Sequence, residues 1–138
     1  MISISIPADL RALRVVGFWI KGCLSYAGDN QESVIYQIEL ALQEICVNIV
    51  EHAYGSASGQ ARIQLEYSYE NSTHKFIVAD QGKPFNPADK PVVDTNDPTE
   101  GGYGLFIAES IFDSVEYHRT DTTNTWTLNM SHSMNAGA

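Results

Sequence analysis

The chain has 138 residues, 43% of them hydrophobic, and a net charge of −9, which is typical of one globular domain and excludes a disordered chain. Its 8 Lys and Arg residues are scattered, so the clustered positive charge that binds nucleic acid is missing. No apolar run approaches the length of a membrane helix, and Asp9, Arg11 and Arg14 interrupt the N-terminal segment where a signal peptide would be apolar. We therefore expect a cytoplasmic domain with neither a nucleic acid nor a membrane as partner.

The N-terminal part of the chain predicts a strand and a helix. The segment ISISIP alternates apolar and polar residues and ends at Pro7, which predicts a short strand at a sheet edge. Asp9 is a suitable helix N-cap, and apolar residues recur after it at helical spacing up to about Tyr26. This apolar set consists of Leu10, Leu13, Val16 and Ile20. For the aromatic residues Phe18, Trp19 and Tyr26 of this helix we allow partial exposure, but expect a place in the core rather than in an interface.

A longer helix is expected from about Gln31 to Tyr54, with Gly55 as its stop. Its apolar positions repeat every three or four residues: Ile35, Ile38, Leu42, Ile45, Ile49 and Ala53. Cys46 lies among these apolar residues, and the second cysteine, Cys23, is distant in sequence. Two distant cysteines fit no metal pattern, so we expect both thiols to be buried and inert.

The second half of the chain predicts a hairpin, a long loop, a helix and two strands. Residues 61–80 change to a period of two on both sides of a turn at NST. Residues 81–101 hold four of the five prolines, and a loop of this length is usually functional. The segment GYGLFIAESIFD then predicts a helix, and the segments SVEYHRTD and NTWTLNM predict two strands. We predict a single α+β domain over residues 1–138, a two-layer sandwich with about three helices on one face of a mixed, mostly antiparallel sheet, and a flexible tail at 131–138.

Polar residues at four-residue spacing lie inside the second helix. Glu44 and Asn48 are about 40° apart around the helix axis, to one side of its apolar face. They form either an ordinary solvated face or the lining of a cavity. His52 lies one turn further along and could likewise have a structural or a functional role. A histidine in a last helical turn often forms a hydrogen bond with a backbone carbonyl.

Two further motifs have nucleotide-binding chemistry. In VADQGKPF, Asp80 ends an apolar strand and Gly82 follows. The carboxylate could accept a hydrogen bond from the amine of adenine, and the glycine could give the adenine ring room. An ordinary Asp-x-Gly turn has the same pattern. In GGYGLF, Gly101, Gly102 and Gly104 precede a helix, where backbone amides can approach a phosphate. A flexible helix entry has the same glycines, and neither a P-loop nor a Rossmann fingerprint fits.

Taken in order, the segments ALQEICVNIVEHAYG, VADQGKPFNP and GGYGLFIAESIFDSVEY resemble the ATP-binding fold of gyrase, the heat-shock chaperones, histidine kinases and mismatch-repair ATPases, the GHKL superfamily. With IPADLRAL and NTWTL, the chain is most similar to the small bacterial anti-sigma factor serine/threonine kinases of partner-switching systems. The resemblance covers nearly the whole chain. It implies an ATP- and Mg²⁺-dependent kinase that phosphorylates a small antagonist protein on Ser or Thr and binds a sigma factor or another regulator. Relatives are often dimers, so a homodimer stays open.

The resemblance also implies roles for individual residues. Glu44 would be the general base that takes the proton of the acceptor hydroxyl, and Asn48 would coordinate Mg²⁺. Asp80 would bind the adenine amine, and Gly82 would give the ring room. The other nucleotide-binding positions implied are His52, Phe85, Gly101, Gly102, Gly104, Leu105 and Thr127, with Thr125 as an alternative to Thr127.

The expected lid, residues 86–101, departs from the family pattern. Some relatives carry a basic residue just before the glycines, whereas this chain has DTNDPTEGG with Glu100 at that place. The nearest basic residues of the loop are Lys83 and Lys90. Without a basic residue in the lid, phosphoryl transfer would be slow, or a partner protein would supply the positive charge. The alternative is a nucleotide-dependent module that sequesters a regulator without turnover, although a pure binder would not need Glu44.

Overall fold

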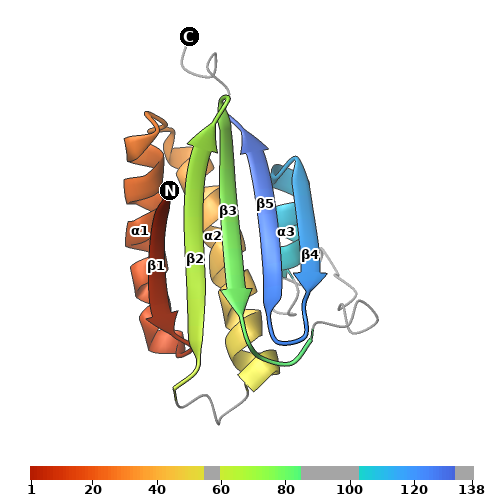
Figure 1. Ribbon diagram of the computed structural model, residues 1–138. Coiled ribbons are helices and arrows are strands. Elements are labelled where there is room, and N and C mark those ends of the chain that lie inside the picture. The colour runs from red at the N-terminus through yellow and green to blue at the C-terminus, as the bar shows by residue number, and fades with distance from the viewer. Residues whose placement is uncertain (55–59, 85–102, 133–138) are drawn as a thin grey trace.

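The computed structural model describes residues 1–54, 60–84 and 103–132. They form a layer of helices packed on one face of a five-stranded sheet (Figure 1). The strands are β1 (Ile2–Pro7), β2 (Arg62–Glu70), β3 (Thr73–Asp80), β4 (Ser114–Arg119) and β5 (Asn124–Ser131). The helices are the 3₁₀-helix η1 (Leu10–Leu13), α1 (Arg14–Tyr26), α2 (Glu32–Asn48), the π-helix η2 (Ile49–Tyr54) and α3 (Tyr103–Ile111). The predicted α+β two-layer sandwich is confirmed.

The sheet has the strand order β1-β2-β3-β5-β4. Every pairing among the described strands is antiparallel, where we expected a mixed sheet. The strand β1 lies at the edge, as its terminal Pro7 predicted, because proline cannot donate to a further strand. The turn between β2 and β3 is made by Asn71 and Ser72, whose φ angles of 52° and 56° lie in the left-handed region. This tight turn sets the register of the hairpin.

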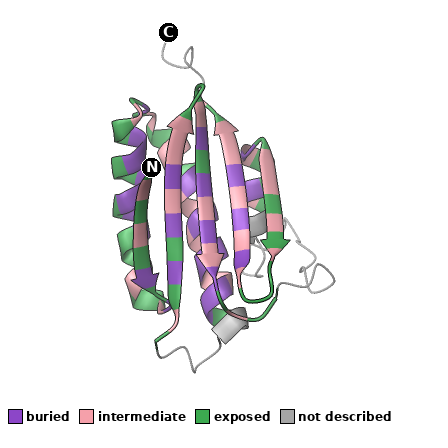
Figure 2. Ribbon diagram, viewed as in Figure 1, coloured by how far each residue is buried: buried purple, intermediate pink, exposed green. Residues whose placement is uncertain are grey.

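The core lies between the sheet and the helices. Buried residues alternate with more exposed ones along β2 and β3, as the colours of Figure 2 show, because successive side chains of a strand point to opposite faces. On β2 the buried residues are Ile63, Leu65 and Tyr67, and on the helices they include Val16, Ile20, Ile38, Leu42 and Ile45. Full burial of one such aliphatic side chain stabilises a fold by about 1.5–3 kcal/mol. These residues are the apolar positions whose spacing predicted the elements.

The first helix differs from the prediction in its exposed residues. Leu10 is half exposed, and Phe18 and Tyr26 each keep 76% of their surface exposed, although we expected all three in the core. Phe18 lies two positions after Val16, which is about 200° around a helix. The rotation that buries Val16 therefore turns Phe18 to solvent, whereas Trp19 is buried as expected.

The second helix is the central helix of the layer and packs against α1, α3 and the sheet. The segment Glu32–Glu51 is long and apolar enough to cross a membrane by length and composition alone, contrary to our expectation that no segment approaches that limit. A core helix passes the same test, and here Ile38, Leu42 and Ile45 are buried inside the domain. The apolar character of the segment is therefore explained by packing.

Both the end of the second helix and the C-terminal tail depart from prediction. We expected one helix to Tyr54, but the α-helix ends at Asn48 and continues as the wider η2. Ser131, expected in the tail, belongs to β5, and its amide and hydroxyl both donate to Asp113 Oδ2. The amide of His132 donates to the Ser72 carbonyl at 2.7 Å. The expected tail therefore begins no earlier than residue 133, and residues 133–138 lie outside the described part.

Candidate nucleotide site

Most of the residues predicted to bind nucleotide belong to elements that meet at one end of the sheet. In Figure 1 the end of β3, the C-terminal half of α2, the start of β5 and the start of α3 all lie at the lower end of the molecule. The packing of α3 against α2 brings these two helices side by side there. Segments far apart in the sequence are thus gathered around Asp80, the last residue of β3.

Asp80 is buried, with 3% of its surface exposed. Its Oδ2 accepts a hydrogen bond from the Gly82 amide at 2.8 Å and another from Asn124 Nδ2 at 3.2 Å. Its Oδ1 accepts none from the residues that the structure describes. Burial, and secondarily the nearby Asp80 carboxylate, raise the pKa of the Cys46 thiol to about 12, so Asp80 lies close to α2. Oδ2 is therefore fixed by the protein, whereas no residue in the described ranges uses Oδ1.

Asn124 is a site residue that the sequence interpretation missed. It is the first residue of β5, lies directly opposite Asp80 in the strand register and is buried. Its Nδ2 donates to Asp80 Oδ2, to the Gly82 carbonyl at 3.2 Å and to the Lys83 carbonyl at 3.1 Å. One amide group thus holds both the carboxylate and the backbone of the loop that follows it.

Two side chains of β4 hold Asn124 in place. Its Oδ1 accepts a hydrogen bond from the Tyr117 hydroxyl and one from Arg119 Nη1 at 3.1 Å. The same Nη1 donates to the Gly82 carbonyl at 2.9 Å. The orientation of the Asn124 amide is therefore set by two donors, which leaves its Nδ2 to point at Asp80 and the loop.

The structure places Asn124 beside Asp80, and neither Thr127 nor its alternative Thr125. On β5 the residues Asn124, Trp126 and Leu128 are buried, whereas both threonines are half-buried and point to the open face. The threonines face away from Asp80 because successive side chains of a strand point to opposite faces. Thr125 and Thr127 lie one and three positions after Asn124. An odd separation along a strand places a side chain on the opposite face of the sheet.

Glu44 and Asn48 lie within the second half of α2, and both side chains are half-buried. Neither makes a hydrogen bond or an ion pair with another residue in the described ranges 1–54, 60–84 and 103–132. A half-buried polar group without a protein partner is open to water or to a ligand. An amide oxygen is a ligand that suits Mg²⁺, so Asn48 fits the expected metal role.

The remaining predicted residues lie wholly or partly outside the description. Phe85, Gly101 and Gly102 are outside the described residues, as are residues 86–101, the expected lid. The side chains of His52 and Leu105 are outside it too. The backbone of Gly104 and Leu105 forms the second and third positions of α3, where amides have no acceptor within the helix. Their contact with phosphate stays a prediction.

Comparison with known proteins identifies the family of the chain. A family model described as the histidine kinase-like ATPase domain matches residues 6–130. A protein of Halalkalibacterium halodurans named serine-protein kinase RsbW is 30% identical over 126 residues, which cover 83% of this chain and 74% of the relative. A protein of the same name from Bacillus licheniformis is 26% identical over 117 residues, which cover 79% of this chain and 72% of the relative.

Solved structures show the same fold. The RsbU and RsbW domains of a Mycobacterium tuberculosis protein match with a TM-score of 0.67 and 20% identity, covering 95% of this chain and 32% of that chain. The histidine kinase domain of a blue-light activated kinase from Erythrobacter litoralis matches with a TM-score of 0.58 and 16% identity, covering 91% of this chain and 61% of that one. The present chain thus spans about a third of the first structure and three-fifths of the second. Because the family model matches most of the chain and a relative reaches 30% identity, the chain belongs to the histidine kinase-like ATPase family, an ATP-binding family, and within it to the serine-protein kinases of the anti-sigma factor type.

Proposed function

We propose that this chain is an ATP-dependent protein serine/threonine kinase that acts as an anti-sigma-factor-type partner switch. It transfers the γ-phosphoryl group of ATP to a Ser or Thr hydroxyl of a small antagonist protein. The observation that carries the proposal is Glu44, a half-buried carboxylate without a described partner on the helix that packs beside Asp80. A sigma factor or another regulator as second partner, a cytoplasmic location and a homodimer belong to the same proposal.

The adenine end of the nucleotide is assigned to Asp80. Its Oδ1 accepts a hydrogen bond from the adenine amine, while Oδ2 stays on Gly82 and Asn124. The absence of a side chain at Gly82 lets the flat ring approach the backbone. A buried carboxylate that discriminates by hydrogen bonding would reject a base with a carbonyl at this position, because two acceptors would face each other. This assignment predicts a preference for ATP over GTP.

The phosphate end is assigned to Asn48 and to the start of α3. Asn48 would hold Mg²⁺ through its amide oxygen, and the ion would supply positive charge that offsets the charge of the phosphates. The backbone amides of Gly104 and Leu105 donate to phosphate oxygens in the first turn of α3. His52, Phe85, Gly101, Gly102 and the lid complete this end according to the family resemblance.

Glu44 is assigned the role of general base. The oxygen of the acceptor hydroxyl forms a bond to the γ-phosphorus while the bond to the β,γ-bridging oxygen breaks, and ADP leaves with that electron pair. The hydroxyl proton passes to the Glu44 carboxylate. Phosphoryl transfer depends more on positioning and charge neutralisation than on covalent help from the protein, so a scaffold of this kind suffices.

Nucleotide binding is tested first, by calorimetric titration of the chain with ATP in the presence and absence of Mg²⁺. Asp80→Asn should weaken binding by about 10–100-fold, the worth of one hydrogen bond to a charged group. Asp121→Asn, at an exposed position, is the matched control and should bind like the unchanged chain. Equal affinity for both variants would remove Asp80 from the site.

Transfer is tested with the pair Glu44→Gln and Glu51→Gln, because Glu51 is an exposed residue of η2. Radiolabelled phosphate is followed from ATP to purified antagonist proteins of the anti-anti-sigma type. Glu44→Gln should keep ATP binding and lose transfer by at least about 100-fold, the usual worth of a general base. Glu51→Gln should behave like the unchanged chain. Unchanged transfer by Glu44→Gln would contradict the assigned role.

The second candidate function is a nucleotide-dependent binding module without turnover. The sequence DTNDPTEGG favours it, because Glu100 stands where some relatives carry a cation. In that case the unchanged chain binds ATP and an antagonist protein but transfers no phosphate, and Glu44→Gln changes neither property. A measurable transfer rate in the unchanged chain excludes this candidate.

A further inference from the structure

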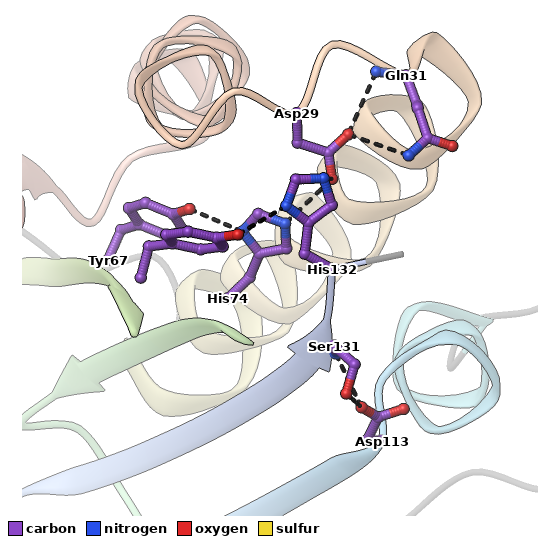
Figure 3. A network of polar contacts seen from close by, with 8 residues as sticks. Asp29, Gln31, Tyr67, His74, Asp113, Ser131 and His132 are labelled. Atoms are coloured by element: carbon purple, nitrogen blue, oxygen red, sulfur yellow. Dashed lines mark hydrogen bonds and ion pairs between the residues drawn. The ribbon is translucent and has the colours of Figure 1, made fainter. Parts of the chain in front are cut away.

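A second polar cluster, drawn in Figure 3, lies at the end of the sheet where β3 begins, whereas Asp80 is the last residue of β3 (Figure 1). It consists of Asp29 in the connection between α1 and α2, His74 on β3 and His132 directly after β5. His74 and Asp80 are six positions apart on one strand, which corresponds to about 20 Å. The cluster therefore takes no part in the candidate nucleotide site, and the inference drawn from it does not rest on the proposed function.

The two imidazole rings converge on one carboxylate oxygen. His74 Nε2 lies 3.0 Å from Asp29 Oδ2, and His132 Nε2 lies 3.5 Å from the same atom. One donor atom from each of the three residues lies within 4.8 Å of the other two. Asp29 and His74 are buried, with 3% and 0% of their surfaces exposed, and 8% of the His132 side chain is exposed.

Tyrosine hydroxyls hold both rings from behind. The Tyr67 hydroxyl lies 2.7 Å from His74 Nδ1, and the Tyr69 hydroxyl lies 2.9 Å from His132 Nδ1. Each Nδ1 is thereby occupied, so each Nε2 points at Asp29. Hydrogen bonding of the second ring nitrogen is the usual way in which proteins orient a histidine that binds a metal.

The carboxylate is oriented in the same way. The backbone amide of Gln31 lies 3.3 Å from Asp29 Oδ1 and its side-chain amide lies 3.4 Å from the same oxygen (Figure 3). Oδ1 is therefore used by Gln31, and Oδ2 is left to face the two histidines. The three donor atoms are all fixed by neighbours that lie outside the cluster.

We propose that Asp29, His74 and His132 form a binding site for a divalent transition metal ion, with Zn²⁺ as the ion that fits best. Two imidazole nitrogens and one carboxylate oxygen are a donor set that Zn²⁺ accepts, whereas Mg²⁺ prefers oxygen alone. With metal–ligand bonds of about 2.0–2.1 Å, neighbouring ligand atoms are about 3–3.5 Å apart. The separations of 3.0 and 3.5 Å already match this spacing, and water completes the coordination.

Ion binding requires only a change of tautomer at the histidines. Without the ion, His74 Nε2–H donates to Asp29 Oδ2, and His132 Nε2 lies 3.5 Å from the same oxygen. With the ion, each Nε2 lone pair faces the metal, and the proton sits on Nδ1 and is donated to the tyrosine oxygen.

The bound ion ties together three segments that are distant in the sequence. They are the connection between α1 and α2, the start of β3 and the end of β5. An ion that binds the folded chain and not the unfolded one raises the unfolding temperature. The site is therefore structural: it fastens the C-terminal end of β5 to the helix layer.

The test is calorimetric titration of the chelator-treated full chain with Zn²⁺, followed by Co²⁺ titration with visible absorption spectroscopy. We expect one Zn²⁺ per chain, a Co²⁺ absorption spectrum that Zn²⁺ abolishes, and a higher unfolding temperature with Zn²⁺. Tyr69→Phe removes only the hydroxyl behind His132 and should weaken binding by about 10–100-fold. His132→Ala should weaken it further, and His118→Ala, at an exposed position on β4, should not change it.

Absence of Zn²⁺ binding by the unchanged chain would overturn the proposal and leave the cluster as a hydrogen-bonded clamp. Binding that persists in both Tyr69→Phe and His132→Ala would also overturn it, because the ion would then sit elsewhere. Circular dichroism checks that the variants fold. If His132→Ala does not fold, the Co²⁺ spectrum of the unchanged chain and the Tyr69→Phe affinity decide the question.

Discussion

The hydrogen bonds of Asn124 predict a large and pH-dependent effect for Asn124→Asp. The substitution keeps the size of the side chain but replaces the donor Nδ2 by an acceptor. That nitrogen donates to Asp80 Oδ2 and to the carbonyls of Gly82 and Lys83. In the variant, a carboxylate oxygen would face the Asp80 carboxylate and the carbonyls of Gly82 and Lys83, none of which can donate a hydrogen bond. The two carboxylates would lie about 3 Å apart.

The size of the loss follows from these bonds. The bond to the Asp80 carboxylate is worth about 1.5–3 kcal/mol, and each bond to a backbone carbonyl is worth about 1 kcal/mol. The Gly82 carbonyl keeps its bond from Arg119, which limits the damage. We therefore expect a loss of about 2–4 kcal/mol in the free energy of unfolding at pH 8, or roughly 8–15 °C in the unfolding temperature of a domain of this size.

The pH dependence has a definite sign. The Asp80 carboxylate faces the introduced carboxyl group and raises its pKa, against the opposing effect of the Arg119 guanidinium on its other oxygen. The folded variant therefore holds this proton at pH values where the unfolded chain has released it. Stability of the variant relative to the unchanged chain therefore falls as the pH rises above about 4, by up to about 1.4 kcal/mol per pH unit. At pH 5 the retained proton can restore a hydrogen bond, and the loss is smaller than at pH 8.

Urea unfolding at pH 5 and pH 8 measures both effects. The matched control is Asn129→Asp on the same strand, because Nδ2 of Asn129 has a single described bond, to the Ser114 hydroxyl at 3.0 Å. The control should lose only about 0.5–1.5 kcal/mol. The reasoning is refuted if the two variants lose equal stability at pH 8, or if the loss in Asn124→Asp shrinks as the pH rises.

Three further predictions concern the core, the thiols and the hairpin. Trp19→Ala empties a buried position and should lower the free energy of unfolding, measured in urea, by about 3–5 kcal/mol. Phe18→Ala changes an exposed position and should lower it by less than about 0.5 kcal/mol. Equal losses would contradict the exposure assigned to α1. Burial raises the pKa of both Cys23 and Cys46 to about 12, so at pH 8 the native chain should react with DTNB far more slowly than the urea-unfolded chain, in which both thiols react. Ser72→Gly should raise the free energy of unfolding by about 0.5–1 kcal/mol, because φ is 56° at this position; an unchanged midpoint would show that the turn is not strained.

Local patterns were sufficient to predict the elements of the fold. The alternation of Ile63, Leu65 and Tyr67 predicted β2, and the helical spacing of Ile38, Leu42 and Ile45 predicted α2. Each set is buried as one face, because burial of an apolar face is what stabilises a strand or a helix in a domain. The widening of the second helix after Asn48 left no comparable trace in the spacing of its apolar residues.

The candidate site was expected from short motifs taken in their order along the chain. The surroundings of Asp80 and Glu44 left two interpretations open for each residue, and only the order of the three motifs, which resembles the family, assigned them to a nucleotide site. Asn124 was missed in favour of Thr127, because its role depends on the register between β5 and β3. The alternation of Trp126 and Leu128 could have shown that Asn124 shares the buried face.

The sequence by itself determined the elements, their order, the family and the residues expected to contact nucleotide, since all of these depend on periodicity or on short motifs. Only the tertiary structure decided which distant side chains meet. Asn124 faces Asp80 because β5 pairs with β3 in one register, and His74 meets Asp29, 45 positions away, because the helix layer brings its first connection over the start of β3. Such contacts follow from strand register and layer packing, which act between segments and therefore leave no periodic signal within either one.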